Sequence, residues 1–135
     1  MMSTTHPTEE TIRVLFIEND PGVAEMYKLK LELDGYQVSV VPNDERVLQE
    51  ADSARPDLIF LDLRSGEDKG FAMLQQLRAT ASTRDVPVII LSKRAASEMA
   101  GQGFTTTVLD YVVRADPGPN DLSWNLQDLA RAGSA

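Results

Sequence analysis

The sequence predicts a doubly wound α/β fold, in which a five-stranded parallel sheet has helices on both faces. Short apolar segments alternate along the chain with amphipathic segments of helical length, which is the order of elements in βα folds. Most of the apolar segments lack the polar alternation of a half-exposed strand, as expected where both faces of a sheet are covered. The 135 residues suffice for one domain with its own core, without disulfide bonds, since the chain has no cysteine.

Five segments have the length and composition of β-strands. Residues 12–17 (IRVLFI), 57–63 (DLIFLDL) and 86–92 (VPVIILS) are almost continuously apolar. Residues 36–41 (YQVSVV) and 109–114 (LDYVVR) are also rich in β-branched and aromatic side chains. Parallel strands need a crossover between them, so we expect helices in the connections.

The first three connections have helical patterns. The first helix is predicted over residues 21–34, because Asp20 is a suitable N-cap, Pro21 favours a first turn and Gly35 ends the pattern. The second and third helices are predicted over residues 43 or 44 to 54 and over residues 70 to 79.

The fourth connection, residues 95–107, has a poor helical pattern. It contains Gly101, Gly103 and three consecutive threonines, which are all unfavourable in a helix interior. The fourth helix is therefore predicted to be short or irregular.

Charge and composition narrow the classes of function. The net charge of −8 disfavours direct binding to nucleic acid or to an anionic membrane, because phosphates would be repelled. The chain starts without the pattern of a signal peptide and has no apolar run of about 18 residues, so we expect a cytoplasmic protein with protein partners. The domain is predicted over residues 11–131, between a disordered tail at 1–10 and a short tail at 132–135, with no output domain after it.

Polar side chains stand where the predicted strands end. In open parallel sheets, ligands bind outside the carboxyl ends of the strands, where the strand order reverses. The residues at these ends should therefore lie in one site. They are Glu18, Asn19 and Asp20 after the first strand, Asp62 after the third, Ser92 after the fourth and Arg114 after the fifth.

These residue types suit phosphoryl chemistry. Mg²⁺ prefers a few carboxylates together with water and phosphate oxygens. A carboxylate beside such a cation can accept a phosphoryl group as an acyl phosphate. A hydroxyl and a fixed positive charge, here Ser92 and Arg114, would then hold the phosphoryl oxygens. We interpret Asp62 as the reactive carboxylate.

An ordered set of motifs carries a family resemblance. ENDP stands at 18–21, Gly-Tyr at 35–36, an Asp-to-Gly spacing at 62–70, Pro-Val at 87–88 before Ser92, and Tyr111 three residues before Arg114. With these motifs, residues 11–131 resemble the receiver domains of bacterial two-component response regulators. The resemblance implies a flavodoxin-like sheet in the order 2-1-3-4-5, and phosphate taken from the histidine of a partner kinase or phosphotransfer protein.

The resemblance also implies roles, residue by residue. It implies a signalling domain that is not an enzyme and that passes its state to a downstream protein partner. Its metal is Mg²⁺. By position, Asp62 is the phosphoacceptor, Glu18, Asn19, Asp62 and the backbone carbonyl of Arg64 are on the metal side, Ser92 is the switch hydroxyl, Arg114 is the basic residue and Tyr111 is the rotating aromatic residue.

Three of the departures from the family pattern bear directly on function. Asn19 stands where the family has a metal-ligating acid, Arg114 where it has lysine, and Ala115 where it has proline. Asn19 should weaken Mg²⁺ binding, and Arg114 could pair with both oxygens of Asp62. These departures favour an alternative, a pseudo-receiver that binds proteins without phosphorylation. A flavodoxin-like cofactor enzyme is disfavoured, because no phosphate-cradling loop follows the first strand.

Overall fold

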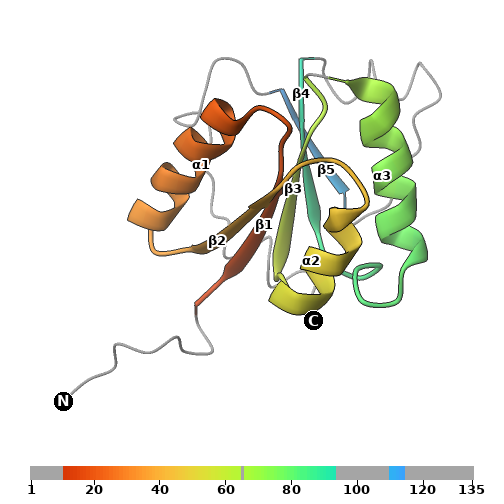
Figure 1. Cartoon of the computed structure of the whole chain (residues 1–135), viewed down its shortest axis with the longest axis horizontal. Helices are drawn as coiled ribbons and strands as arrows, with labels where there is room; N and C mark the ends of the chain where they lie inside the picture. Colours follow the sequence, from red (N-terminus) through yellow and green to blue (C-terminus); the bar gives the residue numbers. More distant parts are fainter. Residues whose placement is uncertain (1–10, 65, 94–109, 115–135) are drawn as a thin grey trace.

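The computed structural model of the protein describes residues 11–64, 66–93 and 110–114, the last of these by their backbone alone. Its centre is a sheet of five parallel strands in the order β2-β1-β3-β4-β5 (Figure 1). The predicted fold class and strand order are confirmed. The strands are β1 (Arg13–Ile17), β2 (Gln37–Val41), β3 (Leu58–Asp62), β4 (Val88–Ser92) and β5 (Asp110–Arg114).

Helices cover both faces of the sheet, as predicted. Helix α1 (Pro21–Leu33) lies on one face, and α2 (Arg46–Ala54) and α3 (Glu67–Ala79) lie on the other (Figure 1). In the described part of the chain, no helix has both the length and the apolar character needed to cross a membrane.

Two predicted helix starts are wrong. Helix α2 starts at Arg46, because Asp44 forms a turn in which its Oδ1 accepts a hydrogen bond from the backbone N–H of Arg46 at 2.9 Å. Helix α3 starts at Glu67, before the predicted start at residue 70. Glycine is unfavourable inside a helix, but α3 runs through Gly70, where the contact with Leu63 leaves no room for a Cβ atom. The predicted irregular connection at 95–107 lies outside the described residues.

The core forms one cluster on each face of the sheet, because successive strand side chains point to opposite faces. Under α1, the rings of Phe16 and Phe60 stack with centroids 5.2 Å apart, and the Tyr27 ring packs on Phe16 with centroids 4.9 Å apart. Leu61 belongs to the cluster under α2 and α3. Every residue of β3 is buried, including Asp62, the acid that ends it.

The strand register brings predicted site residues to one edge of the sheet. Asp62 lies beside Leu91 on β4, and Ser92 lies beside Arg114 on β5. Parallel strands all end at the same edge, so the backbone positions of Asp62, Ser92 and Arg114 gather there. Glu18 follows directly after β1, which pairs with β3.

The spacing from Asp62 to Gly70 has a packing reason. Helix α3 returns over the end of β3, and Gly70 faces Leu63, the residue after Asp62. A Cβ atom on Gly70 would lie 1.8 Å from Leu63 Cδ2. Leu63 is buried and has little room to move. A glycine at this position therefore lets α3 pack close to the carboxyl edge of the sheet.

Gly70→Ala is expected to lower the free energy of unfolding by about 1 to 3 kcal/mol, since the added methyl group overpacks the contact with Leu63. Gly66→Ala is the control, because a Cβ atom there meets nothing within 4 Å and its φ of 171° is extended backbone. Urea unfolding of both variants measures the difference. Equal stability of the Gly70→Ala variant and the parent would contradict the packing argument.

Candidate functional site

Asp62 lines an open pocket at the carboxyl edge of the sheet. It ends β3 and is buried, with 8% of the residue exposed. The pocket has a volume of about 480 Å³ and is lined by Asn19, Asn43, Asp62, Gly66, Glu67, Asp68 and Lys69. Asn19, which follows β1, and Asp62, which ends β3, thus line the same pocket.

Arg64 binds both carboxylate oxygens of Asp62 with two nitrogens of its guanidinium group. Arg64 Nε donates to Asp62 Oδ1 at 2.9 Å and Nη2 donates to Oδ2 at 2.8 Å. The backbone N–H of Arg64 also donates to Oδ1, at 2.8 Å. Both side chains are largely buried, with exposed fractions of 16% for Arg64 and 3% for Asp62. A two-point ion pair of this kind is stronger and more directional than a single contact.

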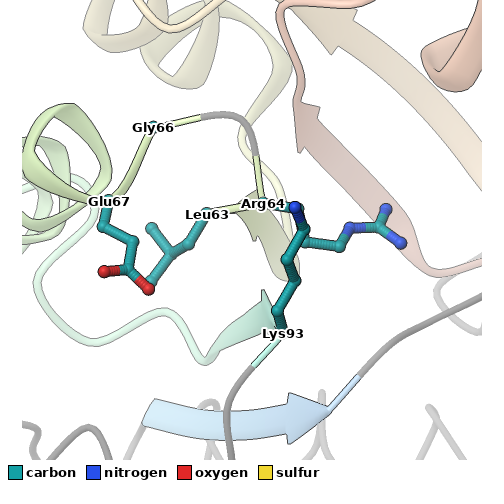
Figure 2. A pocket seen from close by; sticks show the side chains of 5 residues that line it. All are labelled: Leu63, Arg64, Gly66, Glu67 and Lys93. Carbon is teal, nitrogen blue, oxygen red and sulfur yellow. The ribbon is translucent and has the colours of Figure 1, made fainter.

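The same guanidinium group reaches helix α1. Arg64 Nη2 donates to Tyr27 Oη at 3.1 Å, and Arg64 Cζ lies 5.6 Å from the centre of the Tyr27 ring. Figure 2 shows the guanidinium group pointing away from Glu67, one of the residues that line a smaller pocket of about 230 Å³. That smaller pocket is lined by Leu63, Arg64, Gly66, Glu67 and Lys93.

Glu18 is a buried acid next to Asp62. Its Oε2 accepts a hydrogen bond from the backbone N–H of Asp20 at 3.1 Å, and its Oε1 has no hydrogen-bond partner among the described residues. Burial, and then the hydrogen bond to Asp62, raise the pKa of Glu18 to about 8. Glu18 is therefore mostly protonated at neutral pH.

Asp62 itself stays ionised. Burial alone would raise the pKa of Asp62, but hydrogen bonds from the side chains of Arg64 and Glu18 outweigh burial and hold it below its ordinary value of 3.8. The site therefore pairs one neutral acid with one carboxylate, and the counter-charge comes from Arg64.

Asn19 and Asp20 follow β1, and their side chains bind different parts of the protein. Asn19 Oδ1 accepts a hydrogen bond from the backbone N–H of Asn43 at 2.8 Å, which ties the amide oxygen to the loop after β2. Asp20 caps α1 by accepting hydrogen bonds from the N–H groups of Gly22 and Val23. The N-cap prediction for Asp20 is confirmed.

Of the remaining predicted site residues, the structure describes one with its side chain and two by their backbone alone. Ser92 is buried at the end of β4. For Tyr111 and Arg114, only the backbone lies within the described residues. The predicted pairing of Arg114 with Asp62 therefore stays a prediction, while Arg64 makes a pairing of that kind.

By family position, Arg64 has a backbone carbonyl role, and the predicted side-chain partner of Asp62 is Arg114. The signal for the side-chain contact of Arg64 was an arginine two residues after an acid at a strand end. Asp44 and Arg46 have the same spacing and form a similar ion pair, with Arg46 Nη2 2.6 Å from Asp44 Oδ2. A D-x-R pattern can therefore close locally in this chain.

The oxygen atoms at this site are of the kinds that bind a hard cation, but most of them already accept hydrogen bonds. Within residues 11–64, 66–93 and 110–114, no three His, Cys, Asp or Glu side chains are grouped to hold a metal ion. Glu18 and Asp62 supply carboxyl oxygens and Asn19 an amide oxygen, which are ligands that Mg²⁺ accepts. The unpartnered Glu18 Oε1 fits such a role, whereas the Asp62 and Asn19 oxygens already accept hydrogen bonds.

Comparison with known sequences gives one family. Residues 14–118 match the family model of the response regulator receiver domain. The DNA-binding dual master transcriptional regulator RpaA of Synechocystis is 32% identical over 102 residues, which cover 76% of this chain and 42% of that protein. The chain spans less than half the length of this curated relative.

Comparison with solved structures gives the same fold. The receiver domain of a signal transduction histidine kinase from Syntrophus aciditrophicus superposes with a TM-score of 0.70 at 26% identity, covering 92% of this chain and 91% of that one. The receiver domain of the sensor histidine kinase PA1611 from Pseudomonas aeruginosa superposes with a TM-score of 0.68 at 22% identity, covering 93% and 99%. A magnesium ion is coordinated in the active-site cleft of that domain.

Proposed function

Because the chain belongs to the response regulator receiver domain family of two-component signalling, we propose that Asp62 is its phosphoacceptor. Receiver domains are signalling domains that interact with histidine kinases or phosphotransfer proteins. We extend this to the present chain, with a downstream protein as the reader of its state. The observation that carries the proposal is an ionised, buried carboxylate at the carboxyl end of the central strand, facing an open pocket.

The proposed reaction is a phosphoryl transfer. An oxygen of Asp62 attacks phosphorus, the new P–O bond forms as the bond from phosphorus to the donor breaks, and the donor leaves with that electron pair. Because Asp62 is ionised, it attacks without first losing a proton. Ser92 and Arg114, at adjacent positions on β4 and β5, would hold the phosphoryl oxygens.

Magnesium is the proposed cofactor of this step. When bound, it would neutralise charge on the phosphoryl oxygens. Glu18, Asn19, Asp62 and the backbone carbonyl of Arg64 are the residues proposed to hold it. The donor chemistry supports this assignment, and Asn19 in place of an acid predicts weak binding.

Two contacts favour a second function, that of a pseudo-receiver. Asp62 already has a cationic partner in Arg64, and Asn19 is tied to the loop after β2. A receiver whose carboxylate is satisfied in this way could bind its partner proteins without phosphorylation. The two candidate functions differ in one measurable property, the labelling of Asp62.

We expect the parent protein to gain the mass of one phosphoryl group when it is incubated with acetyl phosphate and Mg²⁺, and Asp62→Asn to gain none. Intact-mass spectrometry over a time course measures the gain. Asp57→Asn is the matched control, because Asp57 precedes the same strand at its other end and pairs with Arg13. Labelling that persists in Asp62→Asn would reject Asp62 as the acceptor, and no labelling of any protein would favour the pseudo-receiver.

A further inference from the structure

The chain contains the same D-x-R arrangement in two different environments. Arg46 donates to Asp44 from its backbone N, Nε and Nη2, as Arg64 does to Asp62. The first pair is at the surface, where the Arg46 side chain is 63% exposed. The second is shielded, with exposed fractions of 16% for Arg64 and 3% for Asp62. Water weakens the exposed ion pair far more than the shielded one.

Arg64 occupies the oxygens that the proposed reaction needs. An ionised carboxylate offers about four hydrogen-bond acceptor positions on its two oxygens. Arg64 takes two positions on Oδ1 and one on Oδ2. An oxygen that binds a cation or attacks phosphorus must offer a lone pair in a suitable direction. The side chain of Arg64 and these two events therefore compete for the same atoms.

Tyr27 fixes the guanidinium group from its other side. Its hydroxyl accepts a hydrogen bond from the same Nη2 that donates to Asp62. The Tyr27 side chain is itself fixed, because the residue is 1% exposed and its ring packs on Phe16. The guanidinium group is thus held between a strand end and a helix that are distant in the sequence.

We propose that Arg64 is a built-in counter-ion that blocks Asp62, and that Tyr27 is the positioning residue that keeps it there. Arg64 must leave Asp62 before the carboxylate ligates Mg²⁺ or attacks phosphorus. The first consequence concerns cation binding alone. The second rests on the proposed function of Asp62 as a phosphoacceptor.

Mg²⁺ titration by calorimetry tests the first consequence on the whole chain. Arg64→Met is expected to bind Mg²⁺ at least about tenfold more tightly than the parent, because a charge-assisted contact no longer competes. Tyr27→Phe, which keeps every charge and loses only the hydroxyl, is expected to bind about threefold more tightly. Arg46→Met is the matched control for loss of a positive charge in the same local motif, and is expected to bind as the parent does.

The double variant separates positioning from a merely structural role of Tyr27. If Tyr27 acts through Arg64, adding Tyr27→Phe to Arg64→Met brings no further gain in Mg²⁺ affinity. A threefold gain in both backgrounds would reject the positioning role. Equal affinity of the parent, Tyr27→Phe and Arg64→Met would overturn the whole proposal, and Tyr27→Phe decides the matter if Arg64→Met does not fold.

The rate of labelling by acetyl phosphate tests the second consequence. Tyr27→Phe and Arg64→Met are expected to label faster than the parent, in the same order as their Mg²⁺ affinities. Equal rates would reject the block on attack. Tighter Mg²⁺ binding with no labelling of any variant would support the counter-ion role and reject the phosphoacceptor role, so the two proposals fail in different ways.

Discussion

Without Mg²⁺, the free energy of unfolding is expected to fall as the pH rises from about 4.5 to about 8, by about 1.4 kcal/mol per pH unit at the steepest. Glu18→Gln is expected to remove most of this fall. Burial and the hydrogen bond to Asp62 raise the pKa of Glu18 from 4.5 to about 8. Glutamine keeps the shape and the donor but has no proton to lose.

The direction of the effect follows from proton binding. Between the two pKa values, folded Glu18 holds a proton that the unfolded chain has released. The stability that depends on this proton is complete below pH 4.5 and is lost as the pH rises through about 8. The pKa of Asp62 is lowered, so the contribution of Asp62 is complete above its ordinary value of 3.8 and is lost as the pH falls below it. Asp62 therefore accounts for the loss of stability at low pH, and Glu18 accounts for the loss of stability at high pH.

Urea unfolding across this pH range, with a chelator present, measures both slopes. Glu25→Gln is the control for the change in net charge, because Glu25 is exposed on α1. Parallel stability profiles for the parent and Glu18→Gln would show that Glu18 is not the proton-binding group.

Asn19→Asp is expected to tighten Mg²⁺ binding by about one to two orders of magnitude. The Asn19 Oδ1 atom accepts the hydrogen bond from Asn43 N–H. The other terminal group of the Asn19 amide is NH₂, which carries partial positive charge and repels a cation. In the aspartate variant, one oxygen can keep the bond to Asn43 while the second replaces the NH₂ group. The variant would thus add both a ligand atom and a negative charge.

Asn43→Asp is the matched control for this effect. Asn43 lines the same pocket as Asn19 and Asp62, so its replacement adds the same charge at a different position. We expect a much smaller gain in Mg²⁺ affinity from Asn43→Asp, measured by the same calorimetric titration. Similar gains from the two variants would mean that net charge alone, and not a ligand at position 19, controls the affinity.

The sheet was predictable from sequence because its signal is strong and local. Continuous apolar runs such as 57–63 specify strands covered on both faces, and an acid at the end of such a run, Asp62, stands out. The start of α3 was not predictable, because the contact that requires Gly70 is with Leu63, outside the helix. Helix propensity describes an isolated helix, whereas packing against the rest of the protein determines where a helix needs a glycine.

The site was predictable in position but not in its partners. Glu18 and Asp62 lie together at the strand ends, as expected. Burial raises the pKa of Glu18, whereas hydrogen bonds, first of all from Arg64, outweigh burial and lower the pKa of Asp62. The sequence pattern indicated Arg114 as a partner of Asp62, which stays a prediction, and the structure adds Arg64, two residues from Asp62, as a partner that makes two side-chain contacts with it. The position of Arg64 also depends on Tyr27, which is distant in the sequence.

The short sequence separation of Asp62 and Arg64 also bears on how the chain folds. Burying a lone carboxylate in the central strand would oppose assembly of the sheet. Its counter-ion is only two residues away, so the charge can be neutralised with almost no loop to close. The contact with Tyr27 spans 37 residues and must await the docking of α1. The strand can therefore enter the core with its charge already paired, and the helix completes the arrangement afterwards.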